Sequence, residues 1–174
     1  MKFSTITSAI LFLLIFYFLT VNATLAQSSR FSVNQYNNGK GDTLLYRQLY
    51  PDSDTLRKYP LVIFLHGSGE RGNDNEAQLK WGVMNFASDD AMIRHRAVVI
   101  APQCPAKMQW SNFSRGTGTQ LNLQTAPSKP MELLIELIYH AIKTLPVDTN
   151  RIYITGLSMG GFGTYDAIAR YPHL

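Results

Sequence analysis

Three short runs of apolar residues constrain the fold of this 174-residue chain more than any other feature. Leu61–Leu65 is apolar throughout, Ala97–Ala101 repeats that pattern, and Arg151–Thr155 is a third short segment rich in β-branched residues. A strand with one face in water alternates apolar and polar residues, whereas a strand covered on both faces is continuously apolar. The three runs therefore predict buried strands of a parallel sheet.

Helical patterns separate these runs. Ser128 is a suitable N-cap and Pro130 suits a first turn, and apolar residues then recur at three- and four-residue steps: Met131, Leu134, Ile135, Ile138, Ile142 and Leu145. A less regular helix is expected over Glu76–Ala87, with Trp81 and Met84 facing a sheet, although Gly82 weakens this prediction. Alternating strands and helices indicate an α/β fold with a mostly parallel sheet and helices on both faces.

Two other segments complete the mature domain. Thr43–Tyr50 partly alternates, is rich in Leu and Tyr and ends at Pro51, which favours an antiparallel strand. Ser111–Ala126 has glycines and polar residues without a clear period, so a long surface loop is expected. With 45% hydrophobic and 16% charged residues, and no internal repeat or linker, the chain suits one globular domain.

The motif that carries chemistry is Gly156–Gly160, which reads Gly-Leu-Ser-Met-Gly and matches the G-x-S-x-G nucleophile elbow. It follows a predicted strand and precedes a predicted helix from Met159 to Arg170. In this setting Ser158 is the expected nucleophile, and the amide of Met159 is an expected oxyanion donor at the helix N-terminus. The glycines at 156, 160, 161 and 163 are expected to permit close backbone packing around the turn.

A second loop is suited to complete an oxyanion hole. It begins at His66, directly after the buried run Leu61–Leu65, and contains three glycines that allow backbone amides to face a substrate. The amide of Ser68 is the expected donor, with Gly67 next, and His66 is expected to hold the loop by hydrogen bonds. A phosphate-binding loop is the rival interpretation, but the required Lys and full glycine spacing are missing.

These motifs together resemble the α/β-hydrolase superfamily. Three segments carry the resemblance: His-Gly-Ser-Gly-Glu-Arg-Gly-Asn-Asp-Asn at 66–75, Ala-Pro-Gln-Cys-Pro at 101–105 with Trp110, and Asp-Thr-Asn-Arg-Ile-Tyr-Ile-Thr-Gly-Leu-Ser-Met-Gly-Gly at 148–161. They are similar to secreted carboxylesterases, feruloyl-esterase-like enzymes and predicted peptidases, near the dienelactone hydrolases and prolyl-oligopeptidase-type hydrolases. The resemblance implies a serine hydrolase and specifies the substrate much less well.

The rest of a catalytic triad is not found in the sequence. The superfamily order is Ser, then Asp or Glu, then His. After Ser158 the only candidates are Asp166 and His173, which belong to the helix that follows the elbow or to its end. His95 precedes a buried strand and His140 lies on the polar face of a helix, so neither is expected at the site. The chain is therefore expected to be an incomplete α/β-hydrolase domain that lacks its carboxy-terminal strands.

The amino terminus has the order of a secretory signal peptide. Lys2 supplies a positive start, Ala9–Leu19 is an apolar or aromatic run, and Thr24–Ala26 ends in small residues. Cleavage near Ala26 is expected, which leaves residues 27–174 as a secreted or periplasmic domain. A retained membrane anchor is the alternative, although a span needs about 20 apolar residues.

Composition bears on the partners, disulfides and metal sites that can be expected. The net charge of +4 comes from scattered basic residues, so a nucleic-acid partner is not expected. Cys104 is the only cysteine, which excludes an intrachain disulfide and a cysteine metal site, and a buried non-catalytic thiol is favoured. No cofactor or metal is implied, and the sequence does not define an oligomeric state.

The leading hypothesis is cleavage of carboxylic esters through an acyl-enzyme on Ser158, with a small-molecule or polysaccharide-linked ester as substrate. Trp110 is expected either to line the substrate pocket or to pack in the core. A prolyl-oligopeptidase-type serine peptidase is the close alternative, because ester and amide cleavage share a tetrahedral intermediate. A truncated, catalytically inert product is the third possibility.

Overall fold

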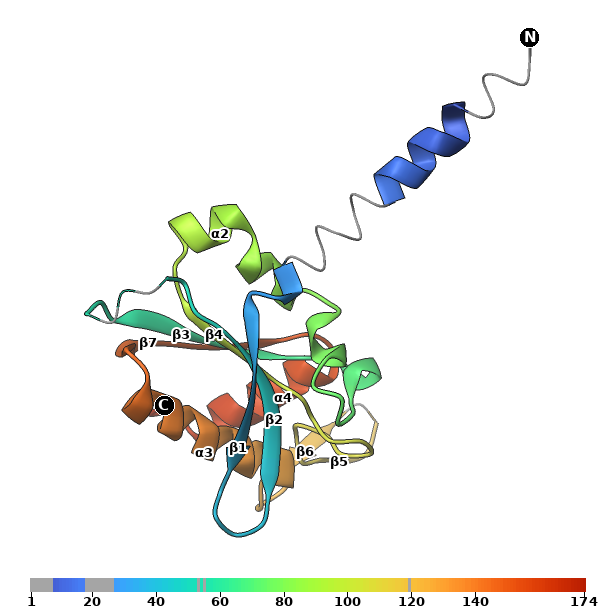
Figure 1. Ribbon diagram of the computed structural model, residues 1–174. Helices are drawn as coiled ribbons and strands as arrows, with labels where there is room; N and C mark the ends of the chain where they lie inside the picture. Colours follow the sequence, from blue (N-terminus) through green and yellow to red (C-terminus); the bar gives the residue numbers. More distant parts are fainter. Residues whose placement is uncertain (1–7, 18–26, 53, 55, 119) are drawn as a thin grey trace.

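The computed structural model describes residues 8–17, 27–52, 54, 56–118 and 120–174. A five-stranded sheet in the order β1-β2-β4-β3-β7 forms the centre of the domain (Figure 1). Its strands are β1 (Phe31–Asn37), β2 (Thr43–Leu49), β3 (Tyr59–Leu65), β4 (Val98–Pro102) and β7 (Val147–Gly156). The three predicted runs are β3, β4 and β7, and they pair in parallel, as expected. The expected burial is correct for β3 and β4 but wrong for β7, which lies at the edge of the sheet and has Val147 as its one buried residue. β2 is the predicted antiparallel strand, and β1, which was not predicted, pairs with it.

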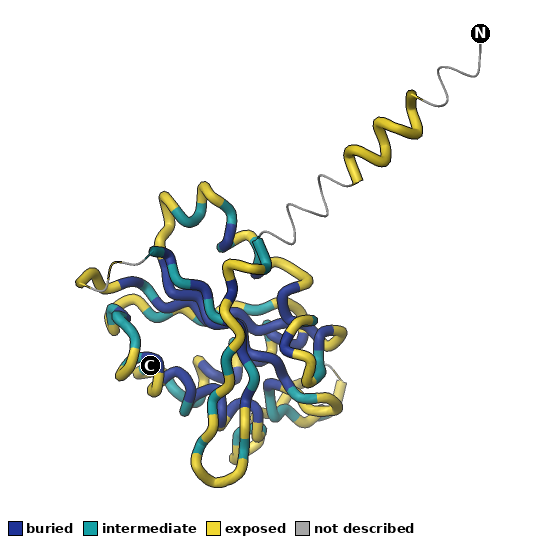
Figure 2. Tube along the Cα trace, viewed as in Figure 1, coloured by how far each residue is buried: buried dark blue, intermediate teal, exposed yellow. Residues whose placement is uncertain are grey.

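Strand β3 is apolar throughout because it contributes to two cores. Leu61, Ile63 and Leu65 belong to the cluster beneath the long helices, whereas Val62 and Phe64 belong to a second cluster on the other face of the sheet. The sheet is therefore covered on both sides, which is the physical reason for the continuous run. Figure 2 shows the same division, with the central strands mainly buried and the turn between β1 and β2 mainly exposed.

Helices α3 (Lys129–Thr144) and α4 (Met159–Arg170) form where the sequence predicts them. Ser128 is the N-cap of α3: its hydroxyl accepts a hydrogen bond from the amide of Met131 at 3.2 Å. Buried residues of both helices join one core cluster, so both cover the same face of the sheet. The opposite face is covered by the segment between β3 and β4. This is expected for two crossovers of the same hand that run in opposite directions across the sheet, one from β3 to β4 and one from β4 to β7.

The predicted helix over Glu76–Ala87 is wrong. This region forms two short 3₁₀ segments, η2 (Ala77–Leu79) and η3 (Val83–Ala87), and helix α2 (Asp89–Arg94) begins only after Ser88. Gly82 has a φ of +80°, which is incompatible with a continuous right-handed helix. An added Cβ there would lie 2.9 Å from Phe64 Cζ. The indole of Trp81 is consequently directed outward and is 54% exposed instead of facing the sheet.

The expected loop over Ser111–Ala126 contains a short hairpin of β5 (Phe113–Arg115) and β6 (Leu121–Leu123). Helix α4 holds its two ends. The carboxylate of Asp166 accepts a hydrogen bond from the amide of Asn112 at 2.7 Å, and Arg170 donates to the carbonyls of Gln124 and Thr125. The segment is thus more ordered than its composition predicts.

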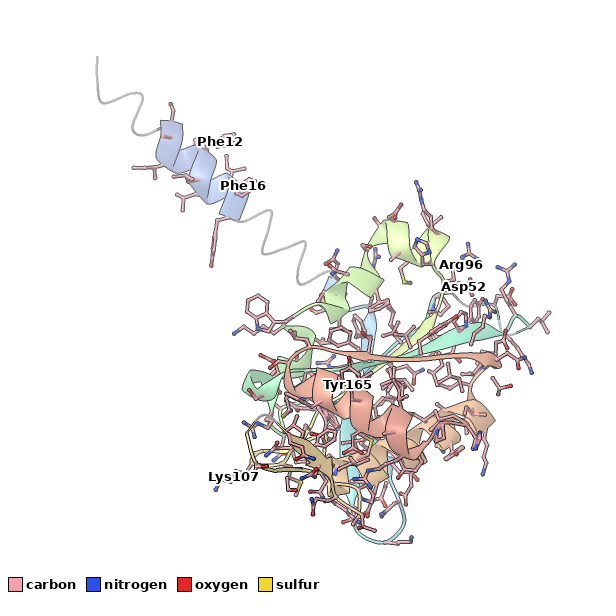
Figure 3. The ribbon with its side chains drawn as sticks, turned by 180° about the vertical axis from the view of Figure 1, so that it is seen from behind. Phe12, Phe16, Asp52, Arg96, Lys107 and Tyr165 are labelled. Atoms are coloured by element: carbon pink, nitrogen blue, oxygen red, sulfur yellow. The ribbon has the colours of Figure 1, made fainter. Side chains whose placement is uncertain are left out.

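The amino-terminal apolar run forms a helix at residues 8–17, from which Phe12 and Phe16 project into solvent (Figure 3). Of the helices that the structure describes, none combines the length and the apolarity required for a membrane span. The expected cleavage site at Thr24–Ala26 lies outside the described residues, so signal-peptide removal stays a prediction.

Strand β7 lies at one edge of the sheet, and the apolar surface beside it is only partly covered. Tyr153 on the strand is 54% exposed, and Ile168 on α4 is 57% exposed. Tyr165 of α4 projects from the domain and is 74% exposed (Figure 3). An edge strand with exposed apolar neighbours is a surface prone to association.

The glycines of α4 provide a matched test of how closely this helix packs. A Cβ at Gly163 would lie 2.5 Å from Trp110 Cβ and 3.0 Å from Leu65 Cδ1, whereas a Cβ at Gly161 would meet only Gly156 O at 3.7 Å. The expectation of close packing is therefore correct for Gly163 and wrong for Gly161. We expect Gly163→Ala to lower the free energy of unfolding by about 1 to 3 kcal/mol or more.

Gly161→Ala is the control, because alanine favours a helix interior over glycine by about 1 kcal/mol. Its stability should equal or exceed that of the unaltered protein. Urea unfolding followed by circular dichroism measures both variants. Equal losses of stability in the two would contradict the packing argument.

Candidate active site

The candidate site lies where two parallel strands end side by side. β3 and β7 are neighbours in the sheet, and Leu65 at the end of β3 pairs with Gly156 at the end of β7. The glycine-rich loop follows Leu65, and the predicted elbow follows Gly156, so parallel pairing brings both segments to one edge. The carboxyl edge of a parallel sheet is where ligands bind in such folds.

The chain turns sharply between β7 and α4. Ser158 has φ +53° and ψ −113°, a conformation that costs a non-glycine residue about 1 to 3 kcal/mol and occurs mainly at functional sites. The flanking glycines make the turn possible: a Cβ at Gly160 would lie 1.9 Å from the carbonyl oxygen of Leu65, and one at Gly156 would lie 2.4 Å from the backbone of Gly160. Leu157 also donates its amide to Leu65 O at 3.1 Å. Ser158 is therefore held, exposed, at the apex of a strand-to-helix turn.

The glycine-rich loop faces this serine. Its 3₁₀ turn η1 (Ser68–Glu70) has Gly67 as N-cap, and the point that a Gly67 Cβ would occupy lies 3.7 Å from Ser158 Cβ. A cavity of about 390 Å³ lies between the two segments, and its lining residues are Gly67, Ser68, Gly69, Glu70, Trp81, Leu157 and Ser158. The two sequence motifs thus form one pocket.

Of the two predicted oxyanion donors, Ser68 lines this pocket, whereas Met159 is next to the lining residue Ser158. Ser68 lies in the loop, and Met159 opens α4 directly after Ser158. Among the described residues, neither backbone amide donates a hydrogen bond to another group. Free amides at a helix N-terminus and in a glycine-rich loop are suited to stabilise a developing negative charge.

His66 holds the loop, as the sequence analysis predicts. Its Nε2 accepts the amide of Cys104 at 2.8 Å, which assigns the ring proton to Nδ1, and Nδ1 donates to Gly67 O at 2.6 Å. Burial lowers the pKa of His66, so the ring stays neutral. Because both nitrogens are engaged, His66 has no free position from which to act as a general base for Ser158.

Trp110 belongs to this support and does not line the pocket, which corrects one of the two alternatives given for it. Its side chain is completely buried. The indole nitrogen donates to His66 O at 3.2 Å, and the ring packs edge-on against the imidazole at a centroid distance of 5.4 Å. The aromatic residue of the pocket is Trp81, which the sequence analysis placed inside a helix.

Gln103 is a second support that the sequence analysis did not identify, although it lies in the quoted Ala-Pro-Gln-Cys-Pro segment. Its side-chain amide donates to Glu70 O at 3.2 Å and to Asp74 Oδ1 at 2.9 Å, and its carbonyl oxygen accepts the amide of Asn75 at 2.7 Å. One buried side chain at the end of β4 therefore fixes most of the loop. Sequence separation hides this role, because the bonds cross 28 to 33 residues.

The remaining candidates are not brought to Ser158. His95 precedes β4 and so lies toward the opposite edge of the sheet, His140 packs against the ring of Tyr36, and His173 follows the end of α4. Asp166 is buried and is engaged by Asn112 and Arg170. Burial raises the pKa of Cys104 to about 12, so its thiol is protonated and unsuited to nucleophilic attack. Across the described part of the chain, no group of three or more His, Cys, Asp or Glu residues is placed to hold a metal ion.

The chain is similar to known proteins in sequence and in structure. The family model described as Phospholipase/Carboxylesterase matches residues 52–174. A thermostable esterase of known structure superimposes with a TM-score of 0.73 and 38% identity, over 84% of this chain and 39% of that one. The S-formylglutathione hydrolase of Agrobacterium tumefaciens has a TM-score of 0.51 and 18% identity, over 80% of this chain and 53% of that one.

A curated relative, the probable dipeptidyl-peptidase 5 of Aspergillus terreus (strain NIH 2624 / FGSC A1156), is 29% identical over 119 residues. The match covers 66% of this chain and 15% of that protein. The chain therefore spans well under two thirds of the length of these relatives.

The buried neutral state of His66 generates a prediction for stability. The folded-state pKa lies below the unfolded value of 6.5, so the unfolded chain binds more protons once the pH falls below about 6.5. We expect the free energy of unfolding to decrease in that range, by at most about 1.4 kcal/mol per pH unit for this one group. Urea unfolding between pH 7.5 and 5 measures the slope.

His66→Gln removes the titrating group and should flatten this slope while lowering stability at every pH. His95→Gln, at an exposed position, is the control and should leave the slope as it is. If His66→Gln keeps the original slope, protonation of His66 does not contribute to it.

Proposed function

We propose that this chain, which belongs to the phospholipase/carboxylesterase family of α/β-hydrolases, supplies the nucleophile and the oxyanion hole of an enzyme that cleaves carboxylic esters through an acyl-enzyme. The family match supports an ester-hydrolysing class, and the α/β-hydrolase fold is shared with a thermostable esterase over 39% of that chain. The single observation that carries the finer proposal is the strained, exposed position of Ser158 opposite the glycine-rich loop.

In the proposed reaction, Ser158 Oγ attacks the carbonyl carbon of the ester while a base accepts its proton. The negative charge that develops on the carbonyl oxygen is stabilised by the amides of Ser68 and Met159, each worth about 2.7 to 4 kcal/mol in comparable enzymes. The alcohol then leaves, and water hydrolyses the acyl group from Ser158. Gly67 permits this approach, because a larger residue would occupy the space beside Ser158.

The base and its orienting acid are proposed to come from outside residues 27–174. Two observations support this: His66 is fully engaged, and His95, His140 and His173 are located away from the pocket. The matched relatives are also longer than this chain, with 39% of the thermostable esterase covered. Residues 27–174 alone would then be nearly inert, since only the oxyanion donors would contribute to rate.

A serine peptidase of the prolyl-oligopeptidase type is the second candidate. The similarity to a probable dipeptidyl-peptidase favours it, and the same tetrahedral intermediate serves amide cleavage. An ester substrate, either a small molecule or one linked to a polysaccharide, remains the leading proposal because of the family match and the 38% identity to an esterase.

Labelling tests the role of Ser158. We expect a fluorophosphonate to modify Ser158 of the full-length natural protein, with the adduct located by mass spectrometry. Ser158→Ala should abolish both the adduct and the hydrolysis of p-nitrophenyl acetate, because the nucleophile is removed, whereas Ser111→Ala, in the segment after Trp110, is the control and should keep both. An adduct on another residue, or full activity in Ser158→Ala, would refute the assignment.

Export is a separate proposal. We propose that the first 26 or so residues are removed during secretion or transfer to the periplasm, because a positive start, an apolar run and small residues follow one another. Amino-terminal sequencing of the exported protein should find a start near Gln27. Protein that retains Met1 in a membrane pellet would indicate an anchor instead.

A further inference from the structure

One carboxylate that lines the pocket, that of Glu70, has no partner in the part of the chain that the structure describes. Glu70 is only 8% exposed and lines the cavity beside Ser158. Among the described residues, no hydrogen bond or ion pair reaches its side-chain oxygens, and the hydrogen bond that Gln103 donates to this residue goes to its backbone carbonyl. Its side-chain oxygens are not among the fully buried polar atoms that lack a partner, so water in the cavity solvates the carboxylate until a cation or hydrogen-bond donor of a ligand replaces that water.

The carboxylate lies near the nucleophile. The point that a Gly67 Cβ would occupy lies 3.0 Å from Glu70 Oε2 and 3.7 Å from Ser158 Cβ, so the two side chains flank the same small space. Gln103 holds the backbone of Glu70, and Arg71 donates to the carbonyls of Ser68 and Met108 instead of pairing with Glu70. These hydrogen bonds fix the backbone of the loop and so the position from which the carboxylate extends.

A fixed negative charge here opposes the reaction of a neutral ester. The tetrahedral intermediate carries a negative oxygen in the same pocket, and like charges in a partly desolvated site repel. A cationic group on the substrate would pair with Glu70 and reduce this repulsion, whereas a neutral hydroxyl could only donate a hydrogen bond. The charge arrangement thus favours a positively charged substrate.

The aromatic wall of the pocket suits the same ligand. Trp81 is 54% exposed and lines the cavity, and Lys80 Nζ lies 5.3 Å from the centre of its indole ring. The ring already accepts an ammonium group from within the protein, at a distance at which cation–π attraction operates. A carboxylate and an indole that border one cavity are a chemically suitable pair for a substrate ammonium group.

We propose that Glu70 is a specificity-determining residue that selects substrates with an ammonium group close to the scissile bond, with Trp81 as the aromatic wall of this subsite. The inference rests on the proposed function, because it concerns the pocket of Ser158. It assigns a cationic ester or aminoacyl compound as the preferred substrate class.

Isosteric ester pairs test the proposal in the full-length natural protein. Acetylcholine and 3,3-dimethylbutyl acetate differ in charge on the alcohol side, and betaine methyl ester and methyl 3,3-dimethylbutanoate differ in charge on the acyl side. We expect kcat/KM to favour the cation in at least one pair, and Glu70→Gln to reduce that preference about tenfold or more. Comparing ratios between variants cancels the different intrinsic reactivities of the esters.

Three controls make the outcome specific. Glu70→Asp retains the charge and should retain part of the preference, and Glu132→Gln, on the exposed face of α3, removes the same charge far from the pocket and should leave the preference as it is. Fluorophosphonate labelling of Ser158 in each variant reports whether the site is folded.

The outcomes separate the two proposals. Ratios that are the same in Glu70→Gln and the unaltered protein would overturn the role of Glu70 while leaving the esterase proposal intact. A higher kcat/KM for the neutral ester in both pairs would overturn the cationic class. A protein that neither forms the Ser158 adduct nor hydrolyses any of the four esters would overturn the proposed function itself.

Discussion

The close approach of α4 to the end of β3 is the constraint on which the rest of the structure depends. A Cβ at Gly160 would lie 1.9 Å from Leu65 O, which leaves no room for any side chain. This contact sets where α4 begins, and the starting point of α4 sets the turn that holds Ser158 at φ +53°. Because Leu65 also precedes His66, one backbone contact positions both the serine and the loop opposite it.

The loop is held by buried polar groups with complete hydrogen bonding. His66 connects three segments: its ring bonds to Gly67 O and to the amide of Cys104, and its carbonyl accepts from Trp110. Such a residue is stabilising only while neutral, since protonation would remove the acceptor that Cys104 requires. Rigidity of the loop matters for the proposed chemistry because oxyanion donors act best when they need not reorganise.

Glu70 differs from these hydrogen-bonded residues of the loop. Its neighbours along the loop are engaged in hydrogen bonds that fix the backbone, yet its carboxylate is left without a partner in a cavity that also contains the serine. A carboxylate that lines a cavity and is not paired within the described part of the protein is available to bind a ligand there. The residues that stabilise the loop and the residue proposed to determine specificity are therefore different, although they lie only a few positions apart.

The sequence alone determined those features whose signal is local. A continuous apolar run indicates a strand covered on both faces, the Ser128 cap and the periodic residues after it define α3, and glycines on both sides of Ser158 are sufficient to predict a strand-to-helix turn. Tertiary structure decided the features that depend on distant partners. Of the two alternatives for Trp110, the core position is the correct one, because the residue packs on His66, 44 residues away. Trp81 lines the pocket instead of facing the sheet, and its exposure depends on how Gly82 fits against Phe64. Likewise, no pattern within residues 66–75 shows that Gln103 would bind the backbone of Glu70 and leave its carboxylate unpaired, because that outcome follows from the pairing of β3 with β4 and not from any spacing along the chain.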